Sequence, residues 1–136
     1  MPRTYTTPTG VTLQFVRTLG AGQFGVANEV KNNKTGSQYC MKEIPVRASD
    51  DKNLALQEVK MMKGMCKHPN VVTCYESWFE RNRLCILMEF ACNGSLETLI
   101  HRYVTSKRTF PERNVVHMAE ELASALDFCH SHGVIH

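Results

Sequence analysis

The fold of this chain is decided by residues 19–25, which read LGAGQFG. Glycines let the backbone approach phosphate oxygens and offer them N–H groups, so the G-x-G-x-x-G spacing is typical of nucleotide-binding loops. Taken alone, the motif also fits a glycine-rich hairpin without a ligand, or a dinucleotide-binding fold in which a helix follows the loop at once. Here residues 26–31 have a strand pattern and residues 32–36, NNKTG, predict a turn, which leaves no room for that helix. The loop is therefore predicted to be a hairpin tip that folds over a ligand.

A lysine and a glutamate follow the loop at positions that suit a paired charge. Lys42 shares a face of its predicted strand with Cys40 and Ile44, because side chains alternate along a strand. A lysine on an inward face is costly to bury unless a phosphate or a carboxylate pairs with it. Glu58 is the candidate carboxylate, since it belongs to the apolar stripe of a helix predicted over residues 51–66. Singly, each residue also fits an ordinary surface charge; in this order they predict a positioning ion pair.

Hydrophobic periodicity and turn signals give the order of the elements. Strand patterns cover residues 11–19, 26–31, 37–44, 71–78 and 83–89, and helical patterns cover residues 51–66, 96–104 and 112–132. Residues 1–10 are rich in Thr and Pro and are predicted to form a short flexible tail. Thr109 and Glu112 have the spacing of a capping box for the last helix, and Gly133 predicts its C-terminal stop.

The composition excludes several classes of protein. The chain has 136 residues, 43% hydrophobic and 21% charged, which fits one globular domain. The net charge is +3 and the Lys and Arg residues are scattered, so no nucleic-acid surface is predicted. No apolar run reaches the length of a membrane span, and the N-terminus lacks the apolar core of a signal peptide. Six cysteines without a C-x-x-C pair favour reduced thiols in a cytoplasmic or nuclear protein over a disulfide framework or a zinc site, and six histidines show no metal spacing.

The motifs occur in an order that is typical of one family. They are LGAGQFG at residues 19–25, Lys42, Glu58, HPNVV at 68–72, LMEF at 87–90, GSL at 94–96, and the helix over 112–132 with GVIH at 133–136. This order resembles the eukaryotic protein kinases over nearly the whole chain after residue 10. The resemblance implies an α+β fold. A five-stranded antiparallel sheet with one helix would form the N-lobe over residues 11–90, and residues 91–136 would form the hinge and the first two helices of a truncated helical C-lobe.

Three segments point to a subgroup of that family. The segments are YCMKEI at residues 39–44, YESWFE at 75–80 and LMEF at 87–90, which resemble the NIMA-related serine/threonine kinases. Ala27 replaces the valine that is usual after the third glycine, as it often does in this subgroup. Ser95 departs from the pattern, because many members have an acidic residue there, near the ribose.

The resemblance implies a binding role for each matching position. The phosphates of ATP would be covered by three glycines of the loop, Gly20, Gly22 and Gly25. Lys42 would hold the α- and β-phosphates and pair with Glu58. The adenine ring would meet side chains of the sheet, namely Leu19, Ala27 and Cys40, and Met88 would be the gatekeeper. The hinge backbone of Glu89 and Ala91 would bind the edge of the ring.

The catalytic half of the family pattern is not among these residues. His136 would be the histidine of the His-Arg-Asp motif, and the catalytic aspartate and the Mg²⁺ ligands would follow it. The resemblance therefore implies ATP as cofactor, Mg²⁺ in a complete domain, and transfer of the γ-phosphate to Ser or Thr of an unidentified protein. These 136 residues alone are expected to be inactive. The alternative is a truncated, non-catalytic module that binds nucleotide or another protein.

Overall fold

The computed structural model describes residues 3–23, 25–46, 49–65 and 67–135, and the side chains of residues 49–51 and 58 lie outside that description. The chain divides into two compact units. Unit 1 comprises Met1–Lys67 and Val72–Phe90, and unit 2 comprises His68–Val71 and Ala91–His136.

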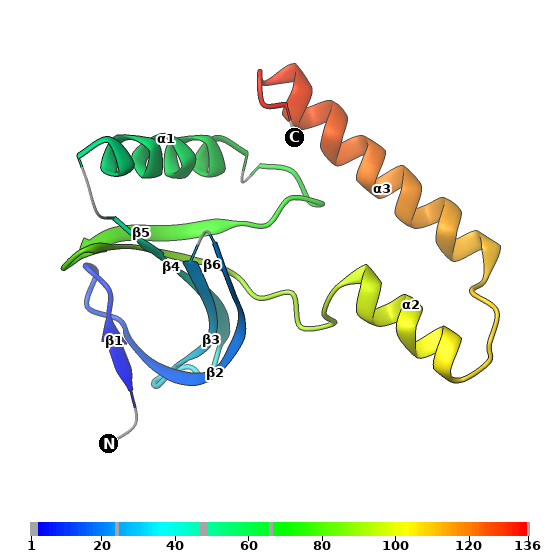
Figure 1. The fold of residues 1–136 in the computed structure, drawn as a ribbon, viewed down its shortest axis with the longest axis horizontal. Coiled ribbons are helices and arrows are strands. Elements are labelled where there is room, and N and C mark those ends of the chain that lie inside the picture. The colour runs from blue at the N-terminus through cyan, green and yellow to red at the C-terminus, as the bar shows by residue number, and fades with distance from the viewer. Residues whose placement is uncertain (1–2, 24, 47–48, 66, 136) are drawn as a thin grey trace. The chain divides into compact units, whose positions relative to one another are not determined.

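Unit 1 is built on one antiparallel sheet of six strands in the order β1-β2-β3-β4-β6-β5 (Figure 1). The strands are β1 (Thr4–Thr6), β2 (Thr12–Gly22), β3 (Gly25–Asn32), β4 (Gln38–Pro45), β5 (Cys74–Glu80) and β6 (Arg83–Glu89). Together with the helices of the chain, this sheet gives the α+β fold that the sequence predicts. The sheet has one strand more than the five predicted.

The extra strand is β1, which lies within the segment predicted to be a flexible tail. Thr4 pairs with Gln14 and Thr6 with Thr12, and the carbonyl of Arg3 accepts a further hydrogen bond from Phe15 N at 2.8 Å. The Tyr5 side chain is buried. Backbone pairing and burial of this aromatic ring together hold the segment on the edge of the sheet.

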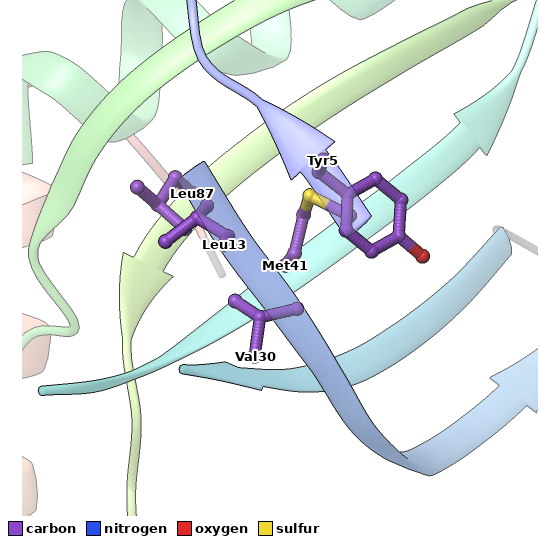
Figure 2. Packing of buried hydrophobic residues seen from close by; sticks show 5 residues of the cluster. All are labelled: Tyr5, Leu13, Val30, Met41 and Leu87. Atoms are coloured by element: carbon purple, nitrogen blue, oxygen red, sulfur yellow. The ribbon is translucent and has the colours of Figure 1, made fainter. Parts of the chain in front are cut away.

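One core cluster lies on the β1 side of the sheet. Figure 2 shows its five buried members, which come from five different strands: Tyr5, Leu13, Val30, Met41 and Leu87. Three of them, Leu13, Val30 and Met41, are fully buried. Trp78 packs against the cluster from β5.

A second cluster lies on the other face, where helix α1 (Ser49–Met65) packs on the sheet (Figure 1). Its buried members come from the helix and from β5 and β6: Ala55, Val59, Cys74, Leu84 and Ile86. Strand β6 contributes to both clusters because its side chains alternate, with Ile86 facing the helix side and Leu87 the β1 side. The helix predicted over residues 51–66 is confirmed with slightly different bounds.

Unit 2 contains helices α2 (Leu96–Thr105) and α3 (Glu112–Ser131). The predicted capping box at Thr109 is wrong, because the N-cap is Pro111, which has no side-chain capping bond, and Thr109 lies two residues before it. The predicted stop at Gly133 is confirmed. Gly133 has a φ of 77°, and the N–H groups of Gly133 and Val134 donate to the carbonyls of His130 and Cys129, which is the Schellman pattern.

The short segment His68–Val71 belongs to unit 2 through its contacts with α3. The His68 ring lies 3.0 Å from Ser124 Oγ through Nε2, and its centroid is 5.1 Å from that of Phe128. Within the part of the chain that the structure describes, no helix combines the length and the apolar character that a membrane span requires.

Candidate nucleotide site

The glycine-rich loop forms the tip of the hairpin that joins β2 and β3, as predicted. Gly20 pairs with Ala27 and Gly22 with Gly25 in the ladder. Gly25 has a φ of +119°, and a Cβ atom on it would collide with the carbonyl oxygen of Glu43, so only glycine fits there. A Cβ on Gly20 or Gly22 would meet no described atom within 4 Å. The backbone of the tip is therefore tightly seated at one glycine and open at the other two.

Lys42 lies in the middle of the sheet, on the face that α1 covers. Its strand β4 alternates between buried Met41 and Glu43 and the half-buried side chains of Lys42 and Ile44. The ladder sets Lys42 opposite Ala27 on β3 and opposite Ile86 on β6. Ile44 packs against the second core cluster, so the predicted common face of Cys40, Lys42 and Ile44 is confirmed.

The positions predicted to hold the adenine ring lie along the same sheet. Cys40 is half-buried and pairs with Met88 on β6, which is also half-buried. Burial raises the pKa of the Cys40 thiol, against the opposing charge of Lys42, so the thiol stays neutral near pH 7 and presents a small apolar surface. Leu19 is exposed and falls in a bulge, because Thr18 and Gly20 pair with β3 and Leu19 does not.

The structure describes neither the side chain of Glu58, in helix α1, nor Phe24, in the glycine-rich sequence. The backbone of Glu58 belongs to α1, one turn from both Ala55 and Met62, which pack on the sheet. Its side chain lies outside the described residues, as do Phe24 and His136. The ion pair between Lys42 and Glu58 therefore stays a prediction.

The predicted hinge positions fall in different units. Glu89 ends β6 in unit 1 and is exposed; its N–H donates to the Thr73 carbonyl at 2.8 Å, and its carboxylate accepts from Thr73 N at 3.2 Å. Ala91 opens the second segment of unit 2, where its carbonyl accepts a hydrogen bond from Gly94 N at 3.2 Å. The carbonyl and the N–H of Thr73 thus both hold Glu89 at the end of β6.

Sequence reasoning missed Glu43, which is the most heavily hydrogen-bonded carboxylate described in unit 1. It lies on the opposite face of β4 from Lys42 and is only 4% exposed. Its oxygens accept from four side chains, at 2.8 and 3.0 Å from Arg3, 2.8 Å from Tyr5, 3.1 Å from Asn28 and 2.5 Å from Arg83. The sequence did contain a signal for Glu43, because a charged residue between the apolar Met41 and Ile44 needs charged or hydrogen-bonding partners if it is buried.

The surroundings of Glu43 keep it ionised. Burial alone would raise the pKa of its carboxyl, but the hydrogen bonds from Tyr5 and Arg83 and the charges of Arg3 and Arg83 hold that pKa below its ordinary value. Burial, followed by the hydrogen bond to Glu43, raises the pKa of Tyr5, so the phenol stays protonated and donates. Lys42 and Glu43 thus give β4 one charged residue on each face.

Comparison with known proteins gives the chain a family. The family described as protein kinase domain matches residues 13–136. That match spans nearly the whole chain, and the chain belongs to the protein kinase family.

Several groups of kinases are similar to the chain at nearly equal identity. Mitogen-activated protein kinase kinase kinase kinase 3 of Homo sapiens is 32% identical over 123 residues, which is 90% of this chain and 13% of that protein. The probable serine/threonine-protein kinase nek1 of Dictyostelium discoideum is 33% identical over 118 residues, 87% of this chain and 24% of that protein. Wee1-like protein kinase 2 of Canis lupus familiaris is 31% identical over 123 residues, which is 89% of this chain and 22% of that protein. The chain thus spans a quarter or less of the length of these relatives.

Proposed function

We propose that this chain is the ATP-binding part of a cytoplasmic serine/threonine protein kinase that transfers the γ-phosphate of ATP to a protein hydroxyl. The observation that carries the proposal is the position of Lys42, which is half-buried in the middle of the sheet. Lys42 pairs with Ala27 on β3, and Ala27 pairs with Gly20 of the glycine hairpin. A cation on an inward sheet face below a glycine tip suits a chain of phosphates. Membership of the protein kinase family supports the same reading.

Each residue of the site has a binding task in this proposal. The backbone at Gly20, Gly22 and Gly25 covers the phosphates, and the space around the first two glycines is open. Lys42 pairs with the α- and β-phosphates and with Glu58. Around the adenine ring, Leu19, Ala27, Cys40 and Met88 supply apolar walls, and the backbone of Glu89 and Ala91 bonds its edge. Among the described residues no three His, Cys, Asp or Glu side chains gather to hold a metal ion.

The finer assignments are part of the same proposal. Residues 11–90 form the N-lobe, and residues 91–136 form the hinge and the start of the C-lobe. The subgroup is the NIMA-related kinases, supported by the motifs YCMKEI, YESWFE and LMEF and by the similarity to nek1. The similarity to other kinase groups is equally high, so the three motifs carry this assignment.

Nucleotide binding tests the proposal directly. The 136-residue chain is titrated with a fluorescent ATP analogue, and the Lys42→Met variant is compared with Lys34→Met, a lysine in the exposed turn after β3. A charge-assisted contact to phosphate is worth about 1.5–3 kcal/mol, so Lys42→Met is expected to weaken binding by roughly ten- to a hundredfold. The Lys34→Met variant should bind as the unchanged chain does. Equal binding by the two variants would remove Lys42 from the site.

A second measurement addresses catalysis by these residues alone. We expect the 136-residue polypeptide to bind ATP without transferring phosphate, because the aspartates that orient substrate and metal in kinases have no counterpart in the motifs found here. Radiolabelled ATP and a generic protein substrate provide the assay, with Lys42→Met as the background. Transfer above that background would contradict the expectation.

A further inference from the structure

A cavity of about 430 Å³ opens on the face of the unit 1 sheet that lies opposite Lys42. It is lined by Arg3 and by residues of β1, β4 and the β5–β6 hairpin: Thr4, Tyr5, Glu43, Glu80, Arg81, Arg83 and Cys85. None of these residues belongs to the proposed ATP site. A volume of this size is in the range of small-ligand sites.

The charges around the cavity leave it cationic. Three guanidinium groups and two carboxylates line it, and the buried carboxylate of Glu43 is already bonded by Arg3 and Arg83. An arginine carries five N–H donors, and the contacts to Glu43 use the Nη2 group of Arg3 and the Nη1 group of Arg83. Both side chains are about half exposed, at 51% and 55%. Each therefore has donors left for a second anionic partner.

Two other lining groups, the Cys85 thiol and the Tyr5 hydroxyl, add no negative charge. Burial, together with the charges of Glu43 and Glu80, raises the pKa of the Cys85 thiol to about 11. The thiol is therefore neutral near pH 7. The Tyr5 hydroxyl is protonated as well, since it donates to Glu43.

Arg81 contributes the third guanidinium from an unusual backbone position. It lies in the turn between β5 and β6 with a φ of 54°, a left-handed conformation that Asn and Gly adopt more readily than Arg. The turn is fixed in place, because the neighbouring Asn82 carbonyl accepts a hydrogen bond from Val46 N at 2.8 Å. Within the described part of the chain, Arg81 has no carboxylate partner. Backbone preference thus does not favour an arginine at this position.

We propose that this cavity is a second anion site, which binds a phosphate group presented as free inorganic phosphate or as the phosphomonoester of a modified side chain. The planar fork of a guanidinium matches two phosphate oxygens, and three such groups around one opening can share the oxygens of one phosphate. A cationic ligand is disfavoured, because Glu43 is fully engaged by its four donors and only Glu80 is left to receive it.

Hydrogen exchange measured by mass spectrometry on the 136-residue chain tests this site at low protein concentration. Sodium phosphate and O-phosphoserine form the two arms, and sodium chloride at equal ionic strength is the reference. The expected result is saturable protection of residues 79–86 and 3–6. A lower half-saturation concentration for O-phosphoserine would identify a phosphorylated side chain as the ligand, and a lower one for inorganic phosphate would identify the free ion.

Two matched variants decide whether the protection arises in the cavity. Arg81→Gln removes one cationic fork and is expected to raise the half-saturation concentration about tenfold, which corresponds to one charge-assisted contact. Arg17→Gln is the control, since Arg17 is an exposed arginine of unit 1 that pairs with Glu29 outside the cavity. Three results would each overturn the proposal and leave the ATP assignment untouched. They are protection confined to residues 19–25, protection equal to that in chloride, and an unchanged half-saturation concentration in Arg81→Gln.

Discussion

Unit 1 and unit 2 bury their apolar side chains to very different extents. In unit 1, two clusters fill both faces of the sheet, and Leu13 and Ile86 are fully buried. In unit 2, the described residues of α3 include one buried side chain, Ala125, and those of α2 include none. Val115 and Leu122 of α3 are 51% and 61% exposed. The difference teaches that an amphipathic pattern predicts a helix well, but does not predict what covers its apolar face.

The energetic consequence follows from the exposed side chains. Burying a large aliphatic side chain contributes about 1.5–3 kcal/mol, and several such contributions are missing along α3. A whole domain is typically stabilised by roughly 5–15 kcal/mol. Unit 1 therefore has the contacts of a stable folding unit, whereas α3 depends on contacts that the described residues do not supply.

The largest expected effect is a difference in hydrogen exchange between the two units of the 136-residue chain. Amides of β4 and β6 should exchange slowly, because they open only when the sheet unfolds, and amides of α3 should exchange roughly a hundredfold faster or more. The same exposed apolar face should make the chain associate as its concentration rises. Sedimentation and exchange on one sample provide both measurements. A monodisperse monomer with a fully protected α3 would contradict the comparison.

A matched pair of leucines tests the same difference by mutation. Leu13→Ala removes a fully buried side chain and is expected to lower the free energy of unfolding of unit 1 by about 2–5 kcal/mol. Leu122→Ala makes the same chemical change on the exposed face of α3 and should alter stability by less than about 0.5 kcal/mol. Trp78, the single tryptophan, packs on the first core cluster and reports the unfolding of unit 1 in urea, and the circular dichroism of the helices reports the unfolding of α3. Similar losses in both variants would mean that α3 is covered.

Local patterns predicted the parts of the fold that depend on neighbouring residues. The glycine hairpin, the common face of Cys40 and Lys42, and the stop at Gly133 are each set by a few adjacent positions. Alternation along a strand and the need for positive φ are properties of a short window, so the sequence carries them directly.

Long-range contacts account for what the sequence did not predict. Strand β1 has three residues, which is too short for an alternating pattern, and its position depends on Glu43, forty residues from Arg3. The cavity likewise joins β1 to the β5–β6 hairpin, two segments far apart in the chain. The Lys42–Glu58 pair stays a prediction from the sequence pattern, and the hinge backbone stays a prediction from family resemblance.

A pair of glycines tests how tightly the hairpin tip is seated in unit 1. Gly25→Ala is expected to cost at least about 1–3 kcal/mol, because alanine is strained at a φ of +119° and its Cβ collides with the Glu43 carbonyl. Gly22→Ala has ordinary φ and open space, so its stability should change by less than about 1 kcal/mol. Urea unfolding followed by Trp78 fluorescence measures both. Equal destabilisation would show that the tip is not seated against β4 in this way.

The smallest expected effect concerns the dependence of unit 1 on acid. The pKa of Glu43 is lower in the folded chain than its ordinary value of 4.5, so the folded state favours the ionised carboxylate. The contribution of the Glu43 charge to the stability of unit 1 is complete when the pH is above 4.5. It is lost as the pH falls toward the lower pKa that Glu43 has in the folded chain. Glu43→Gln should therefore destabilise unit 1 at pH 7 by about 1–2 kcal/mol, a modest amount because Arg3 and Arg83 are half exposed and their charges are screened by water.

The difference between wild-type and Glu43→Gln chains should shrink as the pH is lowered from 5 to 3, because protonation removes the charge that the variant already lacks. Glu80→Gln is the matched control, since Glu80 is an exposed carboxylate at the end of β5. This substitution should change neither the stability of unit 1 at pH 7 nor the slope of that stability with pH. Trp78 fluorescence in urea at several pH values gives both quantities. A constant difference across that range would mean that Glu43 acts by packing and hydrogen bonding alone, and its charge would then contribute nothing to holding β1 on the sheet.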